Sequence, residues 1–205
     1  MGQYLQTSGQ SINRNEDTRN MVNQLRSKLT VERLLQCFSY YMEDCYPKED
    51  LTWEEFDHIF SSTLNNCRPT YEALQENSLI NIYEVFIICA IFVKDTDYNE
   101  KLLCIFKAFD VDDGGTLDRR ELAKFLMCSI MGICKLLKLK APSKLGIQQF
   151  TYEQFKIVDE DGSGSIDFDE FDEWISNSHE IQDFMLRYTG VQTFKFAQMR
   201  YKKER

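Results

Sequence analysis

The sequence lacks the long apolar and signal-like segments that would place it in or across a membrane. Its longest uninterrupted apolar run is nine residues, Val85 to Val93, whereas a helix that spans a bilayer needs about 20 apolar residues. No positively charged stretch followed by an apolar one comes after Met1, so no secretion signal is predicted. We therefore expect a soluble, cytoplasmic protein, with cytoskeletal, ciliary or peripheral membrane association as alternatives.

Basic charge is also scarce. The chain of 205 residues carries 24 Lys and Arg against 33 Asp and Glu, a net charge of −9. Because binding to a phosphate backbone depends on clustered Lys and Arg, nucleic acid is not an expected partner. The 43% of hydrophobic residues is enough for a packed core, which excludes a wholly disordered chain.

Catalytic and disulfide patterns are missing as well. The only two histidines, His58 and His179, belong to no recognisable motif, and neither a phosphate-binding Gly-x-x-x-x-Gly-Lys loop nor a Gly-x-Ser-x-Gly elbow occurs. The seven cysteines form no Cys-x-x-Cys pair and most lie in apolar stretches, so we expect buried free thiols in a reducing compartment. An enzyme is not predicted.

The acidic excess is concentrated in two windows of twelve residues, 110–121 and 159–170. Their net charges are −3 and −6, which together equal the charge of the whole chain. Each window has an acid at positions 1 and 3, Gly at 6, a branched apolar residue at 8, Asp at 9 and Glu at 12. A hard cation with six to eight oxygen ligands requires this pattern from a short loop, so both windows are predicted Ca²⁺ sites.

The spacing assigns a ligand role to eleven residues. They are Asp110, Asp112, Thr116, Asp118 and Glu121 in the first loop, and Asp159, Asp161, Ser163, Ser165, Asp167 and Glu170 in the second. Gly114 at position 5 supplies no side-chain oxygen, so the first site is expected to be weaker and to be a candidate for Mg²⁺ at rest. Gly115 and Gly164 permit a turn with positive φ. Leu117 and Ile166, at position 8, are expected to face each other.

The two windows belong to an internal repeat with an offset of 49 residues. Apolar residues at three- and four-residue spacing flank each loop and predict amphipathic helices, so the unit is helix, loop, helix. The alternative for either segment alone is a solvated, Asp- and Gly-rich turn. With two matched loops and matched flanks, the chain resembles the EF-hand superfamily, and this resemblance implies Ca²⁺ binding.

The N-terminal half has the length for a second pair of such units. Residues 38–56 fit one, with Leu51 at position 8 and Glu55 at position 12. Its position 3 is Tyr46, and Pro47 imposes its own φ on the loop, so no Ca²⁺ binding is expected there. A further remnant has Ile80 at position 8 and Glu84 at position 12, but Ala73 and Gln75 at positions 1 and 3. An ordinary helical segment is the alternative for this remnant.

We therefore predict an all-α protein of four EF-hand units in two lobes, the first two degenerate. The expected domains are a flexible segment 1–28, an N-terminal lobe 29–95, a C-terminal lobe 98–190 and a basic tail 191–205. Val85 to Val93 is predicted to be a buried helix. A dead first unit with the motif Asp44-Cys45-x-Pro47 resembles the neuronal calcium sensor family, which includes guanylate-cyclase-activating and potassium-channel-interacting proteins. In that family, however, Cys and Pro are adjacent and the second unit often functions.

Three further segments invite a functional interpretation. Gly2 is a candidate for N-myristoylation, although the motif requires Ser or Thr where Gln6 stands, and an unmodified start is the alternative. The basic residues of 199–205 could contact an acidic surface such as tubulin or a membrane, or form a solvated end. The lysines of 135–144 suit a helix C-terminus, with docking of an acidic partner as the alternative.

The leading functional hypothesis is a Ca²⁺ sensor, a regulatory subunit that binds an amphipathic helix of a target protein. The groove expected to open on Ca²⁺ binding is lined by Phe125, Leu126, Met131, Trp174 and Ile175. A second groove, in the dead lobe, would contain Trp53, Phe56 and Phe60. The rivals are a structural, light-chain-like subunit of a cytoskeletal or ciliary assembly, bound to its partner regardless of Ca²⁺, and a simple Ca²⁺ buffer.

Overall fold

Helices make up most of the described chain, as the sequence predicts. A computed structural model describes residues 18, 20–25, 27–93 and 97–177. The helices are α2 (Val31–Asp44), α3 (Trp53–Phe60), α4 (Arg68–Leu74), α5 (Ile82–Phe92), α6 (Tyr98–Phe109), α7 (Arg119–Leu137), α8 (Lys144–Val158) and α9 (Phe168–Asn177). The strands β1 (Asp50–Leu51) and β2 (Ile80–Asn81) are two residues long and pair with each other.

Local capping signals explain where the helices begin. A side-chain oxygen just before the first helical residue accepts a hydrogen bond from a backbone N–H of the first turn, which would otherwise lack a partner. The capping residues are Thr30, Thr52, Asn81, Asp97, Asp118 and Ser143. Each capping residue thus fixes the point at which a loop gives way to a helix.

The helices form four helix-loop-helix units joined in pairs. The first unit is α2 and α3, the second α4 and α5, the third α6 and α7, and the fourth α8 and α9. Leu51 pairs with Ile80 in the antiparallel contact of β1 with β2. Leu117 pairs with Ile166, and their two backbone N–H···O contacts measure 2.7 and 2.9 Å. All four are position 8 residues, so the remnant around Ile80 is a true unit and not an ordinary helical segment.

The N-terminal lobe begins earlier in the chain than predicted. Residues 20–25 and 27–28 are helical, and Met21 and Leu25 are 1% and 0% exposed in the main core. Because these residues are four apart, both lie on one helix face. The expectation of a flexible segment 1–28 is therefore wrong for its last part. Gly2, residues 178–190 and the tail 191–205 lie outside the described residues.

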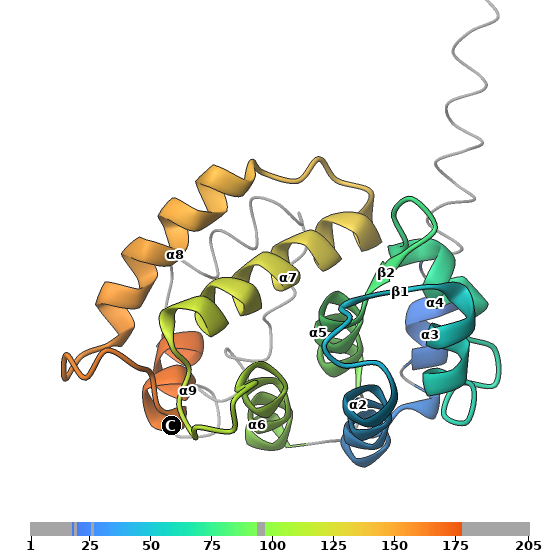
Figure 1. The fold of residues 1–205 in the computed structure, drawn as a ribbon, viewed down its shortest axis with the longest axis horizontal. Coiled ribbons are helices and arrows are strands. Elements are labelled where there is room, and N and C mark those ends of the chain that lie inside the picture. The colour runs from blue at the N-terminus through green and yellow to red at the C-terminus, as the bar shows by residue number, and fades with distance from the viewer. Residues whose placement is uncertain (1–17, 19, 26, 94–96, 178–205) are drawn as a thin grey trace, which may run out of the picture.

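The two lobes share one hydrophobic core rather than forming separate bodies. A single cluster of buried residues runs from Met21 in the first lobe to Ile175 in the second. At its centre lies α5, in which every residue from Ile82 to Ala90 is buried. The buried helix predicted over Val85 to Val93 is thus confirmed up to Ala90, while Ile91 and Phe92 are partly buried and Val93 caps the helix. Figure 1 shows α5 and α6 between α2, α3 and α4 on one side and α8 and α9 on the other, with α7 running across them. The lobes are therefore docked.

A glycine allows α7 to approach α5 closely. A Cβ atom at Gly132 would lie 3.2 Å from the carbonyl oxygen of Glu84 and 3.4 Å from Cγ1 of Ile88. These distances are at or below ordinary van der Waals contact. The absent side chain therefore sets the separation of the two helices at the point where the lobes meet.

The membrane and thiol predictions can be compared with the described residues. Among them no helix is both long and apolar enough to cross a membrane. All seven cysteines are free, and six are buried. Burial raises the pKa of Cys128 to about 12 and that of Cys104 to about 11, so these thiols stay protonated near neutral pH. The prediction of buried free thiols is confirmed.

Candidate metal centre

The first acidic loop gathers carboxylates at the junction of α6 and α7. Asp110 caps the end of α6, and Glu121 lies in the first turn of α7. Carboxylate oxygens of Asp110, Asp112 and Glu121 all lie within 4.8 Å of one another. Three residues that are spread over the twelve of the loop thus converge on one point.

Hydrogen bonds hold Glu121 in this position. Its Oε1 accepts a hydrogen bond from the N–H of Val111 at 2.8 Å, and its Oε2 accepts one from the N–H of Asp118 at 3.0 Å. In return, Oδ1 of Asp118 accepts a hydrogen bond from the N–H of Glu121 at 2.8 Å. This is a capping box, and it points the Glu121 carboxylate back toward the start of the loop.

The second acidic loop repeats the arrangement at the junction of α8 and α9. Carboxylate oxygens of Asp159, Asp161 and Glu170 lie within 4.8 Å of one another. Glu170 accepts hydrogen bonds from the N–H of Glu160 at 3.2 Å and of Asp167 at 3.0 Å. Asp167 accepts one from the N–H of Glu170 at 2.9 Å. The two loops therefore share their geometry as well as their sequence pattern.

Both loops turn through the left-handed region at the same positions. At position 6, φ is +77° at Gly115 and +87° at Gly164, as the pattern predicts. At position 4, φ is +54° at Asp113 and +70° at Gly162. The first loop thus places a non-glycine residue in a conformation that its side chain disfavours. Asp113 is exposed, as are the predicted ligands Asp112 and Asp118.

Position 5 distinguishes the two loops. In the second loop, Oγ of Ser163 donates a hydrogen bond to the carbonyl oxygen of Ser165 at 2.8 Å and lies 3.4 Å from Asp159. In the first loop, Gly114 contributes only its N–H, which donates to Asp110 at 2.8 Å and to Asp112 at 3.0 Å. The first loop therefore offers one side-chain oxygen fewer.

The donor set of each loop fits a hard divalent cation. Every predicted ligand group is an oxygen of a carboxylate, a hydroxyl or a backbone carbonyl, and Ca²⁺ prefers these ligands over nitrogen or sulfur. The residues at positions 7 and 9 are Thr116 and Asp118 in the first loop and Ser165 and Asp167 in the second. Asp118 and Asp167 also cap α7 and α9, so loop and helix geometry are linked.

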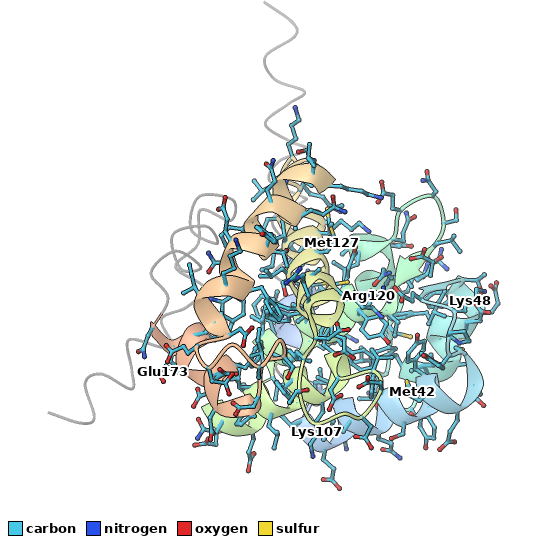
Figure 2. All side chains as sticks on the ribbon, turned by 60° about the vertical axis from the view of Figure 1, so that its left-hand side comes forward. Met42, Lys48, Lys107, Arg120, Met127 and Glu173 are labelled. Carbon is cyan, nitrogen blue, oxygen red and sulfur yellow. The ribbon has the colours of Figure 1, made fainter. Side chains whose placement is uncertain are left out.

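In the first unit, Lys48 contacts the position 12 glutamate, which in the acidic loops lies with aspartate carboxylates. Nζ of Lys48, at position 5, lies 2.6 and 2.7 Å from the two carboxylate oxygens of Glu55, at position 12. Thr52 and Glu55 form a capping box of the kind that the acidic loops have. The Lys48 ammonium group is the largest cause that lowers the pKa of Glu55. Figure 2 shows Lys48 at the outer edge of the molecule, far from Glu173 of α9.

In the second unit the position 12 glutamate is buried and pairs with the other lobe. Oε2 of Glu84 lies 2.8 Å from Nζ of Lys135 on α7, and the two side chains are 8% and 18% exposed. Burial raises the pKa of Glu84, and Lys135 opposes this shift. The sequence reasoning did not find either lysine contact. Lys48 could have been recognised from its loop position, but Lys135 is 51 residues away in sequence.

The residues predicted to line target grooves belong to the core in this structure. Phe125, Leu126, Trp174 and Ile175 are all less than 10% exposed, and Nε1 of Trp174 donates a hydrogen bond to Gln154 at 3.0 Å. Met131 is partly buried and packs against a separate, smaller cluster of Ile130, Cys134 and Ile147. In the first lobe, Phe56 and Phe60 are fully buried, and Trp53 lies under the Arg68 guanidinium at 4.6 Å. Opening either groove would require the helices to move.

Comparisons with known proteins agree with this geometry. Residues 99–176 match the family model of the EF-hand domain pair, a segment that contains both acidic loops. Guanylyl cyclase-activating protein 1 of Gallus gallus is 25% identical over 180 residues, which is 82% of this chain and 84% of that protein. The same protein of Lithobates pipiens is 22% identical over 179 residues, 82% of each chain.

A third relative matches over part of its length only. Lysophosphatidylcholine acyltransferase 2 of Danio rerio is 25% identical over 151 residues, which is 72% of this chain but 26% of that protein. The likeness to the two activating proteins, in contrast, extends over most of both partners. The relatives that match over most of their length are thus activating proteins by name.

Proposed function

We propose that this protein is a Ca²⁺ sensor and regulatory subunit that binds a target helix in a Ca²⁺-modulated way. It belongs to the EF-hand superfamily through its domain pair at residues 99–176. The observation that carries the proposal is the convergence of three carboxylates in each acidic loop. Similarity to guanylyl cyclase-activating proteins along most of the chain supports a regulator over a buffer.

Two ion sites follow from the donor sets. Asp110, Asp112, the Thr116 carbonyl, Asp118 and Glu121 would hold one Ca²⁺. The second site takes the corresponding residues of the other loop, namely Asp159, Asp161, Ser163, Ser165, Asp167 and Glu170. Bound Ca²⁺ offsets the repulsion among the gathered carboxylates. The first site, which lacks an oxygen at position 5, is the weaker one and the one open to Mg²⁺ at rest.

The chain provides a route from the loops to the core. Glu121 and Glu170 lie in the first turns of α7 and α9, so a shift of either carboxylate moves the helix that carries it. The contact between Leu117 and Ile166 joins the two loops, and therefore both helices respond together. Phe125 on α7 and Trp174 on α9 are in ring contact, with centroids 6.4 Å apart. Separating these helices would open an apolar groove for an amphipathic helix.

Capture of partners with the full chain tests this function. The protein is used as bait with Ca²⁺ and with chelator, beside the variant Glu121→Gln/Glu170→Gln and the matched control Glu55→Gln. A partner held by wild type and by Glu55→Gln only when Ca²⁺ is present, and lost in the double variant, supports the sensor. Capture of the same partner by all three proteins with and without Ca²⁺ contradicts it.

A structural, light-chain-like role is the second candidate. The observation that favours it is the ammonium group of Lys48 at position 5 of the first unit, because a lobe whose loops contact lysines does not respond to Ca²⁺. Such a lobe could hold a partner permanently, in a cytoskeletal or ciliary assembly. Myristoylation of Gly2 and contact of the tail 199–205 with an acidic surface remain proposals for residues that the structure does not describe.

A further inference from the structure

Lysines of α7 contact the loop of the second unit across the boundary between the lobes. From this contact we propose that the Lys135 ammonium group takes the place of a metal ion at the degenerate loop 73–84. We propose that it thereby couples the ion site at 110–121 to the N-terminal lobe. The proposal rests on the proposed function only in requiring that loop 110–121 binds Ca²⁺.

The lysine contacts span the degenerate loop from its first position to its last. Nζ of Lys135 lies 2.8 Å from Glu84 at position 12 and 3.4 Å from Glu76 at position 4. Nζ of Lys138 donates a hydrogen bond to the carbonyl oxygen of Ala73, at position 1, at 2.9 Å. In an active loop a metal ion connects positions 1 and 12. Here two ammonium groups, that of Lys135 on α7 and that of Lys138 at the C-cap of the same helix, contact the same two positions.

The packing around the pair shows why it is more than a surface contact. Gly132 lies one turn before Lys135, and its missing side chain brings α7 against the first turn of α5, where Glu84 stands. Both charged groups are largely removed from water, with side-chain exposures of 8% and 18%. A buried charge that loses its partner is strongly unfavourable, whereas an exposed one is not. Removing the Lys135 ammonium group alone would therefore leave the Glu84 carboxylate buried without its partner.

The helix itself connects the pair to the ion site. Glu121 and Lys135 are both on α7, a single helix of 19 residues, and their separation along it is roughly 21 Å at 1.5 Å per residue. In the structure α7 is docked on the N-terminal lobe while the carboxylates of Asp110, Asp112 and Glu121 are gathered. The docked position of α7 is thus the position that suits the ion. Undocking it should lower Ca²⁺ affinity at 110–121.

A second lysine on α7 reinforces the docking, and the first unit provides a contrast. Nζ of Lys124 lies 2.8 Å from Glu49 and 3.4 Å from the ring centroid of Tyr83, both in the N-terminal lobe. Lys48, in contrast, contacts Glu55 within its own loop. The Lys48 ammonium group therefore pairs with a glutamate of its own unit, whereas that of Lys135 pairs with a glutamate of the other lobe.

Calorimetric Ca²⁺ titration of the full chain tests the coupling. Glu170→Gln serves as the background, so that only loop 110–121 titrates. Lys135→Met is expected to weaken Ca²⁺ binding about fivefold, at the lower end of typical coupling between sites. Lys48→Met is the matched control, because it also removes an ammonium group from a position 12 glutamate, and it should leave the affinity unchanged. Lys135→Arg, which keeps the charge, should stay near the background value.

The neutral pair Glu84→Gln/Lys135→Met covers the case in which Lys135→Met does not fold. It leaves no buried charge unpaired, and it should show the same loss of affinity because α7 is no longer tethered. If Lys135→Met and Glu84→Gln/Lys135→Met both bind Ca²⁺ with the affinity of the Glu170→Gln background, the inference is wrong while the proposed function stands. If the background protein itself gives no Ca²⁺ binding at 110–121, the proposed site fails and the inference falls with it.

Discussion

The two lobes have the same framework, but different groups meet the glutamate at position 12. In the C-terminal lobe Glu121 and Glu170 lie with aspartates, in loops that suit a metal ion. In the N-terminal lobe Glu55 and Glu84 lie with lysine ammonium groups. The position 8 pair is kept in both lobes. The framework of a unit is therefore separable from its ion, since a lysine can supply the positive charge instead.

The largest expected effect is the loss of a whole ion site. Calorimetry should show two Ca²⁺ sites, with dissociation constants of roughly 10⁻⁷ to 10⁻⁵ M for a sensor. Glu170→Gln should remove the stronger site and Glu121→Gln the weaker, because each removes one carboxylate oxygen from position 12. Glu55→Gln, at the same position of a dead unit, should remove neither. Three or four sites in the wild type would contradict the division between the lobes.

The next effect compares the two lysine contacts. Lys135→Met leaves Glu84 buried and unpaired, which should lower the free energy of unfolding by about 3–5 kcal/mol. Lys48→Met removes a partly exposed pair and should cost about 0–1 kcal/mol. Guanidinium unfolding with chelator present measures both. Equal losses would mean that the pair of Glu84 with Lys135 is no more buried in solution than a surface contact.

A smaller effect should follow from the spacing of α5 and α7. Gly132→Ala places a methyl group 3.2 Å from the Glu84 carbonyl oxygen, and overpacking of this kind costs about 1–3 kcal/mol. Gly146→Ala is the control, because its new methyl group meets no backbone atom and lies 3.2 Å from Oγ of Ser143, the cap of α8, while alanine favours a helix over glycine by about 1 kcal/mol. Gly132→Ala should therefore lower the unfolding midpoint more than Gly146→Ala does.

The smallest effect concerns pH. The stability contributed by the position 12 glutamates of the two degenerate units should change with pH in opposite directions. Burial raises the folded-state pKa of Glu84 despite Lys135, with Glu76 and Asp50 adding to the rise. Its contribution to stability therefore grows as pH falls from neutral toward 4.5, the ordinary pKa of a glutamate. Lys48 lowers the pKa of Glu55, so its contribution is lost as pH falls below 4.5.

Unfolding midpoints at several pH values with chelator present would separate these contributions. Glu84→Gln should abolish the rise in stability that accompanies a fall in pH from neutral to 4.5. Glu55→Gln should reduce the loss of stability that occurs as pH falls below 4.5. An identical pH profile for both variants and the wild type would contradict the assignment.

The sequence was informative wherever the necessary residues lie close together. Each acidic loop is complete within twelve residues, so its glycine turn, the convergence of its carboxylates at positions 1, 3 and 12, and the pairing of Leu117 with Ile166 could be predicted. The second unit was ambiguous because it has no acids at positions 1 and 3, and the pairing of Leu51 with Ile80 resolves it. The docking of the lobes was missed, because its contacts join distant segments that carry no shared pattern.

The N-terminal boundary was missed for a related reason. Met21, Leu25 and Leu29 lie in a stretch that is otherwise mostly polar, and they contribute to the core because α2–α5 offer a surface to cover. A four-residue spacing in so short a segment is a weak signal by itself. The burial of such residues is decided by tertiary packing rather than by local pattern.

The central position of α5 has a consequence for how the molecule can be divided. A fragment that starts after Val93 would keep both ion loops but lose the helix against which α6 and α7 pack, and the ring of Phe109 would lose Tyr83 at 5.3 Å. Apolar surface uncovered in this way favours aggregation. The N-terminal half thus covers apolar surface of the half that carries both acidic loops, and we expect the two halves to unfold together.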